Sequence, residues 1–277
     1  MSIPLEDLFN DVIAKSMRGL GLSDADLAAK AGVSVEDVAA AKAGTVDDKL
    51  LRKIAPHLQL DGLALVTMAH GDWRPTPVTL KGLAQFNTTY HDMTVNAYLV
   101  WDAETKNAVA FDTGADAGPM IDFIEKHGLN LSLIFLTHTH PDHIMDLAKL
   151  SADGAVTAFV HAREACAGAK TFELGETESW ESGGLKIEPR STWGHSKGGI
   201  TYVVSGLEKP VAIVGDALFA SSMGGGMVSF SDALATNRKE IFTLPDHTVL
   251  CPGHGPLTTV GEEKAHNPFY PEFKSPA

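Results

Sequence analysis

The sequence predicts a layered α/β fold preceded by a small all-α domain, and three observations support this. Short apolar runs typical of buried strands recur in residues 78–277, and several are followed by a glycine and a polar residue. Residues 1–70 instead carry apolar side chains at helical spacing. Between them, residues 71–77 contain two prolines, which break helices and mark a linker. A chain of 277 residues with 44% hydrophobic content can hold one large and one small domain.

The small domain is expected to consist of short successive helices. The spacing of apolar residues and the cap signals predict helices over residues 5–20, 24–30, 35–42 and 48–55. Ser23 and Ser34 are suitable N-caps for the second and third of these helices, since a serine hydroxyl can accept from a free helix amide. This arrangement resembles the helix-turn-helix domains of repressor-type regulators.

The charge of the helical segment argues against DNA binding. A DNA-reading helix needs polar and basic side chains, whereas the corresponding helix offers Glu36, Asp37 and a run of alanines. The segment has ten acidic and seven basic residues, and the whole chain has a net charge of −13. That balance disfavours nucleic acids and anionic membranes as partners. We expect packing, partner docking or the formation of a homo-oligomer through this segment instead.

The most informative motif is the string His-Thr-His-Pro-Asp-His at residues 138–143. It places three imidazoles and one carboxylate within a single turn, directly after an apolar run at 131–136 that predicts a buried strand. Imidazole nitrogens and carboxylate oxygens are ligands that borderline metals such as zinc prefer. One loop cannot complete a metal site by itself, so further ligands are expected elsewhere in the chain.

Three more positions have the features expected of such ligands. His195, Asp216 and His254 each follow a short strand-like run and lie beside a glycine that allows a sharp turn. Residues at the ends of several strands converge in space in layered α/β folds. The sequence therefore predicts one metal site assembled from several strand ends.

These motifs, in this order, resemble the metallo-β-lactamase superfamily and, within it, the glyoxalase II-like hydrolases. The resemblance covers about residues 78–270 and rests on the segments 96–100, 111–114, 138–143, 194–199, 215–219, 252–256 and 267–269. It implies a four-layer αβ/βα sandwich, in which two mixed sheets face each other and helices lie outside. The metals would lie in a cleft at one edge of the sheets.

The resemblance also implies the cofactors, which are two divalent metal ions per chain. Zinc is the first expectation, with iron or manganese as alternatives. The ligands of one ion would be His138, His140 and His195, those of the other Asp142, His143 and His254, and Asp216 would bridge both. Two ions so placed lower the pKa of a shared water towards ~7 and generate hydroxide at neutral pH.

Two carboxylates are assigned roles other than simple ligation. Asp142 lies beside both sets of ligands, so we expect it also to orient the attacking hydroxide as a catalytic residue. Asp112, in an Asp-Thr-Gly turn, is expected to order the metal loop through hydrogen bonds to a ligand rather than to bind a metal itself.

The resemblance implies a small-molecule substrate, a thioester or related acyl ester. Gly225 stands where glyoxalase II relatives place a Lys or Arg that holds glutathione, and the chain ends at Ala277 without their C-terminal helical extension. Both departures argue against a glutathione thioester. Tyr90, Met93 and Gly225 are candidate substrate contacts, although a hairpin tip or core packing explains Tyr90 and Met93 equally well. Lys197 could meet an anionic substrate, although a solvated surface lysine is the more common case.

Two alternative functions remain open. One is a mononuclear iron persulfide dioxygenase of the same fold, with His138, His195 and Asp216 as the iron ligands. The other is a regulator in which the helical domain docks a partner while the second domain senses a metabolite.

Composition predicts a cytoplasmic protein. No apolar stretch approaches the ~20 residues that span a bilayer. The first residues lack the basic and apolar regions of a signal peptide. Cys166 and Cys251 are too few for a disulfide framework.

Overall fold

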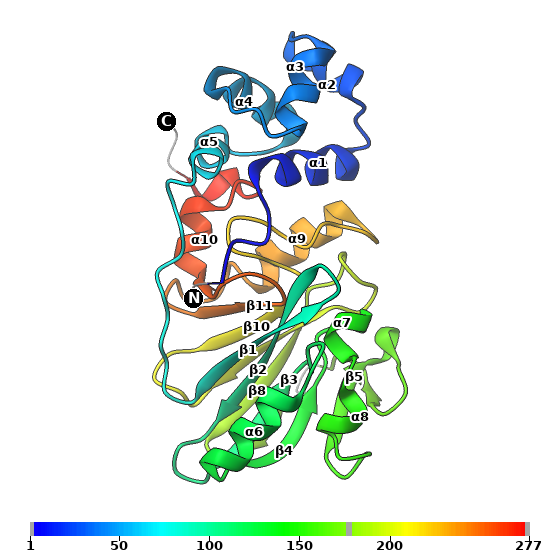
Figure 1. Cartoon of the computed structure of the whole chain (residues 1–277), viewed down its shortest axis with the longest axis vertical. Coiled ribbons are helices and arrows are strands. Elements are labelled where there is room, and N and C mark those ends of the chain that lie inside the picture. The colour runs from blue at the N-terminus through cyan, green and yellow to red at the C-terminus, as the bar shows by residue number, and fades with distance from the viewer. Residues whose placement is uncertain (1–2, 176–178, 275–277) are drawn as a thin grey trace.

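The computed structural model describes residues 3–175 and 179–274 and contains two six-stranded sheets packed face to face (Figure 1). The strands of the first sheet, in spatial order, are β1 (Leu83–Tyr90), β2 (Met93–Trp101), β3 (Asn107–Phe111), β4 (Asn130–Phe135), β5 (Thr157–His161) and β6 (Lys170–Phe172). The strands of the second sheet, in spatial order, are β12 (Thr258–Thr259), β11 (Val249–Pro252), β10 (Val211–Gly215), β9 (Ile200–Ser205), β8 (Leu185–Ser191) and β7 (Trp180–Ser182). Both sheets contain parallel and antiparallel pairs, as predicted.

Helices cover the outer face of each sheet (Figure 1). The elements after the first strand are α6 (Gly118–His127), α7 (Pro141–Ile144), α8 (Leu147–Leu150), η2 (Ala162–Glu164), α9 (Phe230–Glu240), α10 (Val260–His266) and η3 (Pro271–Phe273). Helices α6 and α8 lie on the first sheet, whereas α9 and α10 lie on the second. The four-layer αβ/βα sandwich predicted from the sequence is therefore confirmed.

Strand β2 shows how the layers form. Its side chains alternate between two hydrophobic clusters, because successive residues of a strand point to opposite faces of the sheet. Tyr98 and Val100 are buried between the two sheets, whereas Ala97 and Leu99 are buried beneath the helices of the outer layer. Each face of this strand is thus covered, and its sequence is apolar almost throughout.

An all-helical region precedes the sandwich. Its elements are α1 (Phe9–Leu20), α2 (Asp24–Ala31), α3 (Val35–Lys42), α4 (Asp48–Ile54), η1 (Ala55–Leu58) and α5 (Gly62–His70). Ser23 and Ser34 are the N-caps of α2 and α3, and each side chain accepts a hydrogen bond from the third residue of its helix, as predicted. Helix α5 was not among the predicted helices; Asp61 caps it by accepting from the amide of Ala64.

The helical region and the sandwich share one hydrophobic core. A single cluster joins Val12 and Ile13 of α1 to Leu218, Phe230 and Phe269 of the sandwich. Helix α1 therefore lies directly on α9 and forms an additional layer there (Figure 1). The division into domains at 1–70, 71–77 and 78–277 stays a prediction, as does the kinship with repressor-type helix-turn-helix domains.

Among the residues that the structure describes, none of the helices has the length and apolar character needed to cross a bilayer.

Candidate metal centre

The predicted ligands come from five chain segments that end at one edge of the sandwich. His138 and His140 follow β4, and Asp142 and His143 lie on the short helix α7. The other three ligands each follow a strand of the second sheet, and they are His195 after β8, Asp216 after β10 and His254 after β11. Two hydrogen bonds join the sheets beside them, from Ile200 N to Thr137 O (2.9 Å) and from Asn96 N to Gly253 O (2.7 Å).

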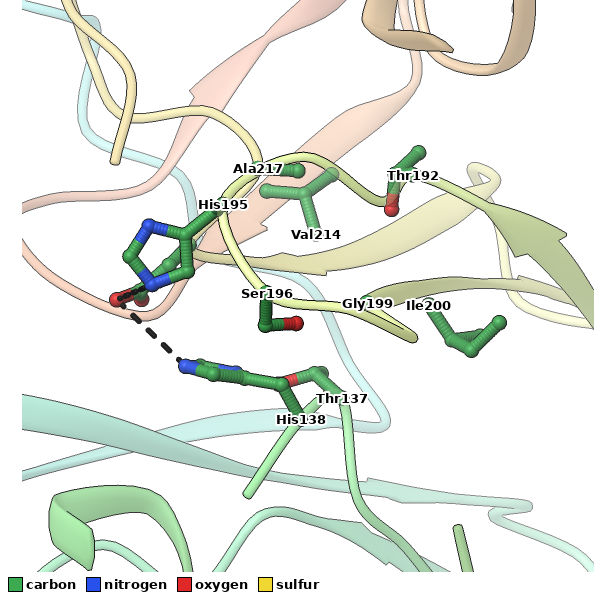
Figure 2. A pocket seen from close by; sticks show the side chains of 10 residues that line it. Thr137, His138, Thr192, His195, Ser196, Gly199, Ile200, Val214 and Ala217 are labelled. Carbon is green, nitrogen blue, oxygen red and sulfur yellow. Dashed lines mark hydrogen bonds and ion pairs between the residues drawn. The ribbon is translucent and has the colours of Figure 1, made fainter. Parts of the chain in front are cut away.

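Four of these residues form a first cluster, in which candidate ligand atoms lie within 4.8 Å of one another: His138, His140, His195 and Asp216. Nδ1 of His140 lies 3.0 Å from Nε2 of His138 and 3.1 Å from Nε2 of His195. Oδ2 of Asp216 lies 3.3 Å from Nε2 of His195 and 3.8 Å from Nε2 of His138. The rings of His138 and His195 point towards the same small cavity (Figure 2).

The other three residues form a second cluster, made of Asp142, His143 and His254. Oδ2 of Asp142 lies 3.3 Å from Nε2 of His254 and 3.6 Å from Nε2 of His143. Asp216 also contacts this cluster, since its Oδ1 lies 3.3 Å from Nε2 of His143 and its Oδ2 lies 3.5 Å from Nε2 of His254. The carboxylate of Asp216 thus lies within about 4 Å of imidazoles of both clusters, which is the placement expected of a bridging ligand.

Hydrogen bonds on the far side of four imidazoles fix which nitrogen faces the centre. Nδ1 of His195 donates to the carbonyl of Gly224 (2.6 Å), and Nδ1 of His254 donates to that of Thr94 (2.6 Å). Nδ1 of His143 donates to Asp112, and Nδ1 of His138 donates to the hydroxyl of Thr137. Each bond holds a proton on Nδ1 and directs Nε2 inward, so that Nε2 is the nitrogen available to a metal ion.

The charges of the site are strongly coupled. Burial lowers the pKa of His138 well below its usual value, and His143 beside it lowers it further. Burial would also lower the pKa of His143, but the carboxylates of Asp216 and Asp112 outweigh it and raise the pKa to about 10. Asp216 likewise outweighs burial at His254 and raises its pKa to about 11. Burial would raise the pKa of Asp216, yet His143 and His254 hold it well below its usual range.

The residues present fit a pair of divalent cations. Nε2 of His143 and Oδ1 of Asp216 are both buried and lie 3.3 Å apart, but within the described residues neither makes a hydrogen bond of normal geometry. Such groups are costly to bury without a partner. Imidazoles and carboxylates are the donor set of zinc and similar ions, and a bound cation would satisfy both atoms.

Asp112 holds the site without belonging to either cluster. Its carboxylate accepts from the amide of Thr137 (2.7 Å), from the Thr137 hydroxyl (2.8 Å) and from Nδ1 of His143 (2.8 Å). It therefore connects the metal loop to the imidazole of His143, and the role expected of it from the sequence stays a prediction. The sequence did not single out Thr137, which joins Asp112 to His138.

Glu164 is a second organising residue that the sequence did not reveal. Its carboxylate accepts from the amide and hydroxyl of Thr139 in the metal loop (3.2 and 2.7 Å) and from the amide of Gly198 in the His195 loop (2.8 Å). The residue is buried on η2 and ties two ligand-bearing loops together. No sequence motif surrounds it, so only the tertiary contacts identify it.

The N-terminal segment also reaches the centre. Asp7 accepts from Lys15 and from the hydroxyl of Ser222, which lies on the loop after Asp216. The backbone amide of Glu6 lies 3.3 Å from the position that a Cβ would have at Gly255, next to His254. Sequence reasoning placed residues 1–70 outside the site, and no motif in that segment indicated these contacts.

The four predicted substrate contacts lie around the centre. Tyr90 and Met93 face each other at the tip of the β1–β2 hairpin, and the next residue, Thr94, accepts from His254. Lys197 is exposed two residues after His195. Gly225 has a φ of 67°, and its carbonyl lies 3.2 Å from Nδ1 of His195. This carbonyl therefore helps to orient the imidazole of His195. Substrate contact by any of the four stays a prediction.

A two-sheet sandwich with histidine and aspartate clusters at one edge defines a metal-dependent enzyme of the αβ/βα class. The chain belongs to the metallo-beta-lactamase superfamily, whose family profile matches residues 92–254. The helical region lies outside that match.

Similar proteins and solved structures agree with this assignment. A protein of Streptococcus pyogenes named "Probable metallo-hydrolase" is 29% identical, over 67% of this chain and 89% of its own length. The hydroxyacylglutathione hydrolase GloC of Haemophilus influenzae is 29% identical over 63% of this chain and 92% of its own. The crystal structure of BLEG-1 B3 metallo-beta-lactamase superposes with a TM-score of 0.59 at 30% identity, covering 68% of this chain and 99% of that one. The clusters and these relatives indicate a metallo-hydrolase.

Proposed function

We propose that this protein is a dinuclear metal-dependent hydrolase of thioesters or related acyl esters. The observation that carries the proposal is the position of Asp216, which contacts imidazoles of both ligand clusters. The similarity to the hydroxyacylglutathione hydrolase of Haemophilus influenzae supports the thioester class. The metals are proposed to be zinc, because all seven ligands are imidazoles or carboxylates.

When bound, two divalent ions supply Lewis acidity that lowers the pKa of a water molecule and polarises an acyl carbonyl. The protein's residues hold the geometry for this chemistry. His138, His140 and His195 would bind one ion, and Asp142, His143 and His254 the other, with Asp216 shared. Asp142 has its carboxylate beside His254 at the edge of the second cluster, where it can accept a proton and orient the nucleophile.

The second cluster favours hydrolysis over the alternative of a mononuclear iron dioxygenase. A single iron on His138, His195 and Asp216 would leave Asp142, His143 and His254 assembled within 4.8 Å without a ligand to bind. Maintaining buried histidines and carboxylates at that spacing is costly unless a cation compensates them.

The deciding experiment combines metal analysis with a substrate panel. The protein is purified without added metal, its zinc, iron and manganese are quantified, and thioesters, lactones and phosphodiesters are assayed on the same sample. Close to two zinc ions per chain together with thioester hydrolysis supports the proposal. One iron per chain with oxygen uptake on a persulfide would overturn it.

The remaining expectations concern location and partners. The two cysteines, Cys166 and Cys251, are both free thiols, in keeping with the proposed cytoplasmic location. We propose a small molecule as the partner, and neither nucleic acid nor membrane. A homo-oligomer through the helical region and a regulatory role for that region also stay predictions.

A further inference from the structure

We propose that Arg18 of helix α1 forms a cationic subsite beside the Gly225 loop of the metal centre and selects acyl substrates that carry a second, negatively charged group. The inference rests on the proposed function, because it describes the substrate of that same site. It assigns part of the active site to the helical region, which lies outside the family match.

Helix α1 is held firmly against the loop that follows Asp216. Nζ of Lys15 donates to the carbonyl of Met223 (2.8 Å). A Cβ at Gly19 would overlap the Phe230 ring of α9, so the helix and that ring are in close contact. The hydroxyl of Ser16 donates to the carbonyl of Leu58 (2.5 Å) and fixes the other face of the helix. Side chains on α1 therefore keep a defined position relative to this loop.

Only the backbone of Gly225 separates Arg18 from the imidazole of His195, a proposed metal ligand. A terminal nitrogen of its guanidinium is 3.3 Å from the position that a Cβ would have at Gly225. The carbonyl of Gly225 is in turn 3.2 Å from Nδ1 of His195. Sequence reasoning took Gly225 as a sign that this subsite lacks a basic group. In the structure, the guanidinium of Arg18 on α1 lies next to the space that a side chain at position 225 would occupy.

The charge on Arg18 is not neutralised by the protein. Its neighbour Lys15 is paired with Asp7, whereas Arg18 has no ion-pair partner in residues 3–175 and 179–274. The side chain is exposed and can meet a ligand. Guanidinium groups bind carboxylates through paired, charge-assisted hydrogen bonds, and the protein as a whole carries a net charge of −13. An unpaired arginine beside the metal centre is thus suited to a carboxylate on the substrate.

Two exposed apolar side chains follow Gly225 on the same loop. Met227 is 64% exposed and Val228 is 47% exposed, and the amide of Val228 donates to the carbonyl of Gly194, next to His195. Exposed apolar residues at a binding cleft commonly contact an apolar part of the ligand. Together with Arg18 they fit an acyl chain that ends in a carboxylate.

The test compares two N-acetylcysteamine thioesters, of glutarate and of glutarate monomethyl ester, which differ only in the distal carboxylate. The variants are Arg18→Ala and Arg18→Glu, with Arg52→Ala as the matched control because Arg52 is an exposed helix arginine far along the helical region. We expect the ratio of kcat/KM for the charged to the neutral thioester to fall about tenfold in Arg18→Ala, the size of one charge-assisted contact. It should fall further in Arg18→Glu and stay at the wild-type value in Arg52→Ala.

A binding measurement separates this inference from the proposed function. Calorimetric affinities of zinc-loaded protein for glutarate and for monomethyl glutarate should show the same loss of preference in the Arg18 variants. An unchanged ratio in both experiments, or an equal loss for both thioesters, would overturn the role of Arg18. If the wild-type protein hydrolyses neither thioester, the proposed function fails, while the binding ratio still decides whether Arg18 recognises a carboxylate.

Discussion

Replacing Asp112 with Asn tests whether the metal centre depends on a residue that binds no metal. The carboxylate is 2% exposed and accepts from Nδ1 of His143 and from Thr137. Its backbone has a φ of 56°, a conformation that Asn tolerates better than most residues, so the substitution adds little strain. An amide NH₂ in place of Oδ2 would face the Nδ1–H of His143, and two donors cannot pair.

The imidazole would then adopt its other tautomer, with the proton on Nε2, where the lone pair must face the metal. Losing a buried, charge-assisted hydrogen bond costs about 1.5–3 kcal/mol. Because the cost falls on the metal-bound tautomer, we expect metal affinity at the second cluster to fall roughly 10- to 100-fold, with a similar loss of kcat. The first cluster should keep its ion, since none of its four members accepts from or donates directly to Asp112.

Competition with a chromophoric chelator measures both affinities in one titration. Asp116→Asn is the control, because Asp116 lies in the same loop but is exposed and forms hydrogen bonds with Gly118 and Lys149. Circular dichroism verifies that both variants are folded. Wild-type affinity for two ions in folded Asp112→Asn protein would refute the argument and show that the surrounding packing alone orients His143.

Three further predictions concern Asp216, Glu263 and the helical region. Asp216→Ala should abolish turnover and reduce bound metal below one ion per chain while circular dichroism stays unchanged; appreciable activity would exclude a bridging role. Burial raises the pKa of Glu263 to about 7, against 4.5 in the unfolded chain, so the folded state binds the proton more tightly and stability is lost as pH rises between these values. Urea unfolding at pH 5 and pH 8 should therefore show a loss of roughly 2.5 kcal/mol that Glu263→Gln removes and the exposed control Glu36→Gln retains; equal pH dependence in all three proteins contradicts it. Deleting residues 1–77 should uncover the apolar surface of Leu218 and Phe230 and yield protein that aggregates and binds hydrophobic dyes; a monomeric fragment with native metal content would argue against the shared core.

The fold and the ligand clusters could be predicted from the sequence because each depends on residues close together in the chain. The run at 131–136 became β4, and the other strand-like runs became β8, β10 and β11, since a buried strand needs consecutive apolar residues. The ligands follow those strands directly, so a short window of sequence contains both the strand and its ligand. The serine caps of α2 and α3 were also predicted correctly, because capping depends on residues only three positions apart.

Other features depend on contacts between distant segments. Glu164 joins two loops through Thr139, 25 positions away, and Gly198, 34 positions away, and carries no motif of its own. Helix α5 escaped prediction because its buried and exposed faces are set by neighbours rather than by a clear polar stripe.

By itself, the sequence determined which side chains can bind metal and which strands carry them, since metal chemistry demands particular residue types next to buried strands. Only the tertiary structure decided what surrounds them. It placed Asp216 between the two clusters, turned four imidazoles by hydrogen bonds to their Nδ1 atoms, and laid α1 across the loop of Gly225. From the sequence, the helical region was expected to be a separate domain, because its apolar residues recur at helical spacing whereas residues 78–277 contain strand-like runs. It is joined to the centre because its apolar face packs on α9, which brings Arg18 to a site some 200 residues away in the chain.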